Sequence, residues 1–201
     1  PNKGDKIRAF NELRYLARTH DVDLACLVDD PADMGHRSEL EKVCRRVLAL
    51  PLGRTRSRAM GADSLLSGGA LSTAYFYSPA LQRRLDRWMG MERYDAAICF
   101  SSPMAEYLFR SPAWRGRFQP VLRPRGGRGS VRRSPGGAGT GSRVVMDFCD
   151  VDSDKWKQYA HTSPFPRRLL FEIESRRLLQ YEMRVNQAFD HSVFVSRQEA
   201  D

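Results

Sequence analysis

Residues 94–105, YDAAICFSSPMA, join a short apolar run to two serines and a proline. A short apolar run without helical spacing is typical of a buried strand, and serine followed by proline is typical of a helix start. The sequence therefore predicts a buried strand at residues 94–100 that leads directly into a helix at residues 101–110. A strand followed at once by a helix is the repeating unit of a parallel sheet.

The same alternation continues on both sides of this stretch. Short apolar runs predict further strands at residues 22–28, 47–51, 144–148 and 191–195. Apolar residues at helical spacing predict further helices at residues 5–18, 33–46, 78–89, 156–161 and 166–188. Right-handed crossovers between parallel strands place helices on both sides of a sheet. The sequence thus predicts an α/β fold, a Rossmann-like parallel sheet with helices on both faces.

The net charge of +9 is concentrated in one segment. Residues 115–143 hold eight Arg, eight Gly and three Pro but no Asp or Glu, so removing them leaves +9 − 8 = +1. A segment of this composition buries too little apolar surface to offset the entropy lost on ordering. We expect a disordered Arg/Gly-rich insertion. The alternative is a patch that binds nucleic acid or an anionic surface, although aromatic residues for base stacking are not interleaved with the arginines.

The cysteines and the apolar runs bear on the compartment. Cys26, Cys44, Cys99 and Cys149 are widely spaced, which favours reduced cysteines of a cytosolic protein over a disulfide framework. No apolar run approaches the roughly 18 residues needed to cross a bilayer, and no signal peptide is visible. We therefore expect a cytoplasmic protein.

Ligands of open parallel sheets bind beyond the carboxyl ends of the strands, and the opening turn, NKGDKIR, is one candidate for that edge. Gly4 lets the backbone approach a ligand closely, and Asp5 is the expected N-cap of the helix that follows. The cations of the turn are Lys3, Lys6 and Arg8. Together these residues would suit a phosphate or diphosphate, and an ordinary capping turn is the alternative. Ser101 and Ser102 offer a similar choice between binding an anion and capping the next helix, and capping is favoured.

The densest polar cluster is DFCDVDSDKW, residues 147–156. A calcium loop is rejected, because Lys155 stands where the turn glycine belongs and His161 where the bidentate glutamate belongs. A metal–nucleotide site or a phosphatase loop is disfavoured. The favoured interpretation is a capping and orienting loop at the mouth of a cleft, where carboxylates hydrogen-bond a sugar or the next helix. Carboxylates this close repel one another, so Lys155, Arg167 or Arg168 is expected nearby.

Other chemistry is not indicated. The histidines share no metal-ligand spacing, and no G-x-S-x-G elbow is present. Charges of alternating sign in the helix at residues 166–188 predict a solvated, ion-paired face. These charged residues are Glu172, Glu174, Arg176, Arg177, Glu182 and Arg184.

Six stretches, in their order along the chain, resemble one family. They are KGDKIR at 3–8, LVDDPAD at 27–33, SGGALSTAYF at 67–76, FSSPMA at 100–105, DFCDVDSDKW at 147–156 and SVFVS at 192–196. The set is similar to the amino-terminal half of bacterial sugar transferases of glycosyltransferase family 4, in particular the subgroup associated with exosortase and exopolysaccharide gene clusters. The similarity extends over nearly the whole chain, apart from the Arg/Gly-rich insertion.

The resemblance implies a fold and an activity. Members of this family have the GT-B architecture, in which an acceptor-binding and a donor-binding Rossmann-like domain face each other across a cleft. They typically retain anomeric configuration and need no bound metal. The resemblance implies the acceptor-binding part of a retaining glycosyltransferase of the hexosyltransferase type. Such an enzyme moves a sugar from a nucleoside diphosphate sugar, its co-substrate, to a lipid-linked exopolysaccharide glycan without a further cofactor.

The resemblance also implies which part of the enzyme residues 1–201 represent and which partners the enzyme binds. In relatives a strand precedes the KGDKIR loop and a donor domain follows, so residues 1–201 are expected to be one acceptor-binding domain without its first strand and without the donor domain. Such a fragment is expected to be inactive alone. The implied partners are a nucleotide sugar and a glycan or polyprenyl-linked glycan acceptor, not nucleic acid. The implied location is cytoplasmic or peripheral at the inner face of the plasma membrane.

Site residues carry over only where the motifs match. The implied residues near the donor diphosphate or the acceptor are Lys3, Gly4, Asp5, Lys6, Arg8, Ser101, Ser102, Asp150, Asp152 and Asp154. Tyr75 and Phe76 are expected to border the acceptor path as stacking surfaces. Many relatives have a His in the region where this chain has aspartates, so no catalytic residue is assigned. The alternatives are a basic binding protein acting through residues 115–143 and a metal-dependent phosphotransferase built on Asp150 and Asp152.

Overall fold

A computed structural model describes residues 4–53, 64, 68–114 and 142–200. Lys3 and residues 115–141 of the predicted insertion lie outside the described residues. The strands are β1 (Asp23–Val28), β2 (Arg46–Pro51), β3 (Ala96–Phe100), β4 (Arg143–Asp147) and β5 (His191–Val193). The helices are α1 (Gly4–Leu16), η1 (Pro31–His36), α2 (Arg37–Glu41), α4 (Leu71–Tyr75), α5 (Pro79–Met91), η2 (Ser102–Met104), α6 (Ala105–Arg110), α8 (Asp152–Thr162), α9 (Arg167–Ala188) and α10 (Arg197–Ala200).

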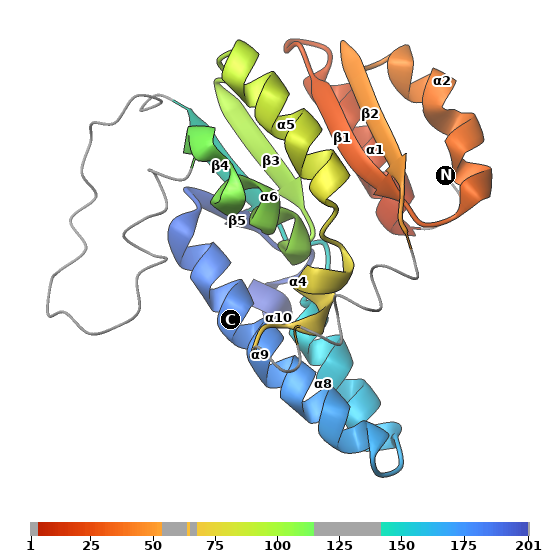
Figure 1. The fold of residues 1–201 in the computed structure, drawn as a ribbon, viewed down its shortest axis with the longest axis vertical. Coiled ribbons are helices and arrows are strands. Elements are labelled where there is room, and N and C mark those ends of the chain that lie inside the picture. The colour runs from red at the N-terminus through yellow and green to blue at the C-terminus, as the bar shows by residue number, and fades with distance from the viewer. Residues whose placement is uncertain (1–3, 54–63, 65–67, 115–141, 201) are drawn as a thin grey trace, which may run out of the picture.

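The α/β prediction with parallel strands is confirmed, but the strands form two sheets. β1 pairs in parallel with β2, and β4 pairs in parallel with both β3 and β5. Figure 1 shows strands of both sheets running in the same general direction, with α5 in front of the junction between β1 and β3. In the described part of the chain no strand joins β1 to β3.

Helices cover both faces of the smaller sheet. On one face, Leu13 of α1 packs with Leu24 and Cys26 of β1, and on the other, Leu81 of α5 packs with Ala25. The larger sheet has its main core on one face only, where α6 and α9 cover Cys99, Val144 and Met146. This core consists of Cys99, Ala105, Leu108, Phe109, Trp114, Val144, Met146, Phe148, Val185 and Phe189. The opposite face carries Ile98 and Val193, which are 49% and 42% exposed.

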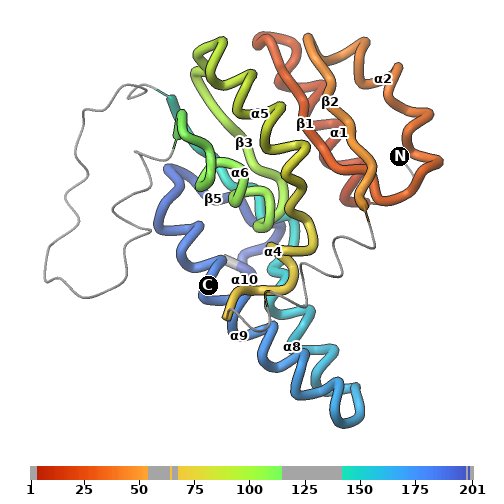
Figure 2. The backbone as a smooth tube through the Cα atoms, viewed as in Figure 1, coloured from red at the N-terminus to blue at the C-terminus, as the bar shows by residue number. Residues whose placement is uncertain are grey.

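Beyond the carboxyl ends of the strands, α8 and α9 form a hairpin that projects away from both sheets (Figure 1). The tube in Figure 2 follows the described chain from α1 to α10, and α10 lies beside α9. Within the described residues, no helix combines the length and the apolar character needed to cross a membrane.

Most predicted elements are present, and the differences have physical causes. The helix predicted at residues 33–46 ends at Glu41, because Arg46 opens β2 and binds Asp23 of β1. The helix predicted at residues 156–161 begins earlier, at Asp152, since carboxylates in a first turn are favourable near the positive end of a helix. The strand predicted as buried at residues 94–100 is half exposed, because Ile98 lies on the open face.

The start of α5 follows its sequence signals. Ser78 caps the helix by accepting a hydrogen bond from the backbone N–H of Leu81 at 3.4 Å, and Pro79 follows it. Asp5, the expected cap of α1, instead lies inside the first turn of that helix. The four cysteines are free, as predicted; Cys44 and Cys99 are buried, and Cys26 and Cys149 are half buried.

Candidate functional site

The ends of β3 and β4 meet in a strained edge. Ser101 follows β3 with a φ of 76°, and Cys149 follows β4 with a φ of 62°, so both non-glycine residues adopt the left-handed conformation. The Ser101 N–H donates to the carbonyl of Asp147 at 2.7 Å, and the Cys149 N–H donates to the Asp147 carboxylate at 2.9 Å. Strain of this kind concentrates where a fold positions functional groups. The edge between these two strands is therefore the candidate site.

Two carboxyl–hydroxyl pairs lie at this edge, one in front of the other. The half-buried Ser101 hydroxyl is 3.5 Å from the Asp152 carboxylate, whose side chain is 28% exposed. Behind them, the buried Ser102 hydroxyl lies 3.4 Å from Oε1 of Glu182, which is 4% exposed as a residue. The outer pair can reach a ligand, and the inner pair supports it.

Burial changes the acidity of both carboxyls. Burial, together with the neighbouring Asp152 carboxylate, raises the pKa of Glu182 to about 7. Burial also raises the pKa of Asp152, although the Lys155 ammonium opposes that shift. Oε2 of Glu182 is buried without a hydrogen-bond partner, which fits a carboxyl that holds its proton up to near-neutral pH.

The predicted cation beside the aspartates is Lys155. Its ammonium binds Asp150 at 2.6 Å and Asp152 at 3.3 Å, whereas Arg168 instead binds Glu172 of its own helix. Asp154 is exposed in the first turn of α8, two residues after Asp152 and hence about 200° around the helix from it. The structure thus brings Asp150 and Asp152 together and leaves Asp154 apart.

Neither serine caps the following helix through its side chain, so the favoured capping interpretation is wrong. The Ser101 hydroxyl turns to Asp152 and the Ser102 hydroxyl to Glu182, because the left-handed turn at Ser101 redirects the chain.

Both described cations of the opening turn are held by carboxylates. Lys6 binds Asp33 and, at 3.5 Å, Asp29, both of which follow β1. Arg8 donates to Asp147 at 2.5 Å and to Glu12 at 2.8 Å. These ion pairs fix the start of α1 at the carboxyl edge of both sheets. A Cβ added at Gly4 would meet no atom within 4 Å, so the space beside this helix start is open.

The predicted acceptor-path residues lie at the end of α4, which packs against η2 and α9. Tyr75 and Phe76 are half buried and stack edge to face with ring centroids 5.0 Å apart. The carbonyl of Phe76 accepts a hydrogen bond from the Tyr107 hydroxyl at 2.8 Å. The helix that carries the two rings therefore packs on the turn that begins at Ser102, but no described contact links the rings themselves to Asp152.

The structure corrects the prediction of a solvated face on α9. Glu174 and Glu182 are buried, at 0% and 4% exposure, because they share a stripe of the helix with Leu178 and Val185. The spacing of these four residues, at steps of four, four and three, is the signal that could have identified the burial. Charge alternation alone pointed to solvent.

Two cavities border the carboxyl edge and the open face. One of about 750 Å³ lies between α1 and the larger sheet, lined by residues that include Ile7, Arg8, Ile98 and Asp147. A smaller one of about 310 Å³ lies at the ends of β1 and β2. In the part of the chain that the structure describes, no group of three or more His, Cys, Asp or Glu is arranged to hold a metal ion.

No protein-family model matches the chain, and comparisons with curated proteins and with solved structures found no match. The chemistry of the carboxyl edge is therefore the basis on which a function can be proposed.

Proposed function

We propose that this chain is the acceptor-binding domain of a retaining glycosyltransferase of the GT-B architecture. The complete enzyme would move a sugar from a nucleoside diphosphate sugar to a lipid-linked exopolysaccharide glycan. The observation that carries the proposal is the carboxyl–hydroxyl cluster of Ser101, Ser102, Asp152 and Glu182 beyond the ends of β3 and β4. This is the edge at which open parallel sheets bind ligands.

The cluster suits the hydroxyl groups of a sugar. An ionised Asp152 accepts hydrogen bonds, and the Ser101 hydroxyl both donates and accepts. Lys155 adds donors on the same side of the cluster, because it already binds Asp150 and Asp152. A sugar hydroxyl held between such groups is oriented for attack on a donor. Orientation lowers the activation barrier because the hydroxyl loses its freedom of motion on binding, before the reaction.

The donor diphosphate has a separate place in the proposal. The open helix start at Gly4 presents backbone N–H groups and the positive end of α1. Lys6 and Arg8 contribute by fixing this helix start to Asp33 and Asp147, since their charges are already paired. Most of the stabilisation of the departing diphosphate would come from the donor-binding domain, so residues 1–201 alone would be inactive in transfer.

Saturation-transfer NMR with a panel of octyl glycosides below their micelle concentrations tests the proposal. The octyl chain imitates the lipid side of the acceptor, and each glycoside presents a different set of hydroxyls. At least one member should receive saturation from the protein, whereas free uridine diphosphate should receive little because the proposal assigns most of the donor's binding to the other domain of the enzyme. A panel without any binder would contradict an acceptor site at this edge.

The alternative is a binding function of residues 115–143, of which residues 115–141 lie outside the described residues.

A further inference from the structure

We propose that the rings of Trp156 and Tyr159, here called the aromatic pair, form a second sugar subsite. This subsite holds the penultimate sugar of an acceptor glycan while Asp152 holds the terminal sugar. The inference rests on the proposed function and deepens it, because it assigns the enzyme an acceptor of at least two sugars. The aromatic pair is distinct from Tyr75 and Phe76, the rings that the sequence predicts for the acceptor path.

The aromatic pair lies on the same side of α8 as the carboxylate of the candidate site. Trp156 and Tyr159 follow Asp152 by four and seven residues. At about 100° and 1.5 Å per residue, Tyr159 lies within about 20° of Asp152 around the helix and about 10 Å farther along it. α8 leads away from the sheets in the hairpin that it forms with α9 (Figure 1). A glycan that extends from Asp152 along α8 therefore meets the aromatic pair.

The aromatic pair combines an exposed ring with a fixed one. Tyr159 is 54% exposed, whereas Trp156 is half buried. The indole N–H of Trp156 donates to the Ser72 hydroxyl at 3.1 Å, and that hydroxyl donates to the buried Glu174 at 2.8 Å. The indole is therefore held by a group in the protein interior. A surface whose geometry is fixed before binding loses little freedom of motion when a ligand binds.

A third ring supports the aromatic pair from α9. The ring centroid of Phe171 lies 5.2 Å from that of Trp156 and 6.3 Å from that of Tyr159. The two rings of the pair are 6.0 Å apart and stand at 87° to each other. Tilted and edge-to-face arrangements of this kind are favourable between aromatic side chains. The exposed tyrosine is thus held by packing on both helices of the hairpin.

The surroundings of the aromatic pair favour a sugar ring over a lipid chain. Lys155 lies one helical turn before Tyr159, is 44% exposed at its side chain and binds Asp152. A sugar ring has C–H groups on its faces and hydroxyls on its edge, so it can stack on Tyr159 while its hydroxyls reach the Lys155 ammonium. Ligand sites combine apolar and polar groups in this way. An acyl chain would displace water from these charges without replacing its hydrogen bonds.

The test compares octyl monosaccharides with octyl disaccharides that carry the same terminal sugar, beginning with octyl glucoside and octyl maltoside. Titration calorimetry below the micelle concentrations measures the affinity of each glycoside for the full chain. The variants are Tyr159→Ala, which removes the ring, and Tyr159→Phe, which retains it. The matched control is Tyr15→Ala, because Tyr15 is 70% exposed on α1. Thermal unfolding of each variant shows whether it is folded.

The wild type, Y159F and Y15A should bind the disaccharide roughly 10-fold more tightly than the monosaccharide, because the second ring stacks on the aromatic pair. Y159A should lose this preference and keep its affinity for the monosaccharide.

Two results would overturn the second subsite alone. One is equal affinity of the wild type for both glycosides. The other is a Y159A variant that weakens both glycosides by the same factor, because Tyr159 would then contact the terminal sugar or the octyl chain. Failure of every octyl glycoside to bind would instead contradict the proposed function, and this inference with it.

Discussion

Glu174 and Glu182 lie two helical turns apart on the buried stripe of α9, and only Glu174 has a hydrogen-bond partner at both oxygens. Its Oε1 accepts from the backbone N–H and hydroxyl of Ser72 at 2.8 Å each, and its Oε2 accepts from the Leu71 N–H at 2.6 Å. Glu182 lies 3.4 Å from the Ser102 hydroxyl through Oε1, and its buried Oε2 has no hydrogen-bond partner. The first carboxylate anchors α4, and the second lies behind the candidate site.

Replacing Glu174 with Gln should destabilise the protein. An amide has only one acceptor oxygen, so it cannot accept all three hydrogen bonds that the carboxylate accepts. One donor at the start of α4 therefore loses its partner. The expected loss of unfolding free energy at pH 7 is roughly 1–3 kcal/mol. Urea denaturation measures it, with Glu41→Gln on exposed α2 as the matched control. An E174Q protein as stable as the wild type would show that the anchor contributes nothing.

Replacing Glu182 with Gln should change how stability depends on pH. Burial raises the pKa of Glu182 from 4.5 to about 7, so between these values the folded state holds a proton that the unfolded chain has released. The contribution of Glu182 to the stability of the wild type therefore falls as pH rises from 4.5 to 7, by at most about 3 kcal/mol. E182Q has no carboxyl that titrates at this position, so its stability relative to the wild type should be higher at pH 8 than at pH 4. A difference between the two proteins that is the same at both pH values would contradict a buried, high-pKa carboxyl.

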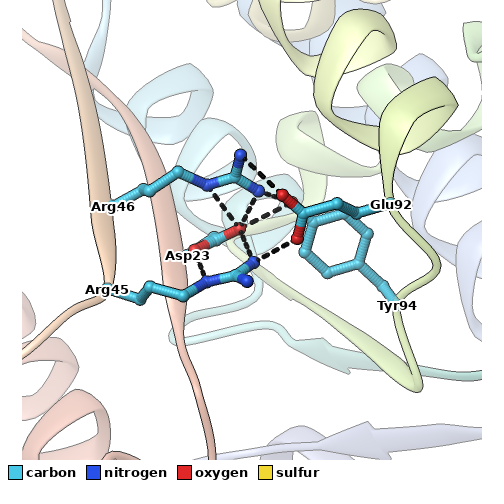
Figure 3. A network of polar contacts seen from close by, with 5 residues as sticks. All are labelled: Asp23, Arg45, Arg46, Glu92 and Tyr94. Atoms are coloured by element: carbon cyan, nitrogen blue, oxygen red, sulfur yellow. Dashed lines mark hydrogen bonds and ion pairs between the residues drawn. The ribbon is translucent and has the colours of Figure 1, made fainter.

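Replacing Asp23 with Asn should weaken the junction between the two sheets. Asp23 is 2% exposed at its side chain and accepts hydrogen bonds from Arg45, Arg46 and Tyr94 (Figure 3). Burial alone would raise the pKa of Asp23, but these donors hold it well below its usual range. The unfolding free energy of D23N at pH 7 should be about 3 kcal/mol below that of the wild type, because two guanidinium groups lose a buried counter-charge.

Acid titration provides a second readout for Asp23. A depressed pKa contributes stability that is complete above the unfolded value of 3.8 and is lost as pH falls below it. The difference in unfolding free energy between the wild type and D23N should therefore become smaller as pH falls from 4 to 2. Asp21→Asn, two residues earlier and exposed, is the control and should change neither quantity. A difference in unfolding free energy that stays constant down to pH 2 would contradict the ion pairs assigned to Asp23.

Replacing the seven Arg of residues 115–141 with Ser lowers the net charge to +9 − 7 = +2. Retention on heparin should fall, since it reports positive charge. Binding of an octyl glycoside should stay the same if the carboxyl edge holds the acceptor. Loss of glycoside binding in this variant would instead favour the Arg/Gly-rich insertion as the functional segment.

Much of the fold could be predicted from local signals. The strand DLACLV, the Ser78–Pro79 helix start and the parallel arrangement all follow from apolar spacing and capping chemistry. The division into two sheets could not be predicted, because apolar runs indicate where strands lie in the sequence but not which strands pair. The buried glutamates of α9 were missed for a similar reason, since charge alone suggests solvent while only the shared stripe with Leu178 reveals burial.

The candidate site was predicted in part. The aspartates and serines were placed at the correct edge because that edge follows from strand direction. The contacts of Ser101 with Asp152 and of Ser102 with Glu182 depend on a left-handed residue at Ser101, and no sequence rule assigns that conformation to a serine.

Binding of an octyl glycoside to wild type, Asp152→Asn and Asp154→Asn proteins tests the central claim most directly. The glycoside is the strongest binder of the NMR panel, and affinity is measured by titration calorimetry. Asp152 contacts Ser101 at the edge, whereas the exposed Asp154 lies about 200° around α8. Loss of a charged hydrogen bond predicts roughly 10- to 100-fold weaker binding for D152N and unchanged binding for D154N. Equal affinities of all three proteins would contradict an acceptor site built on Asp152.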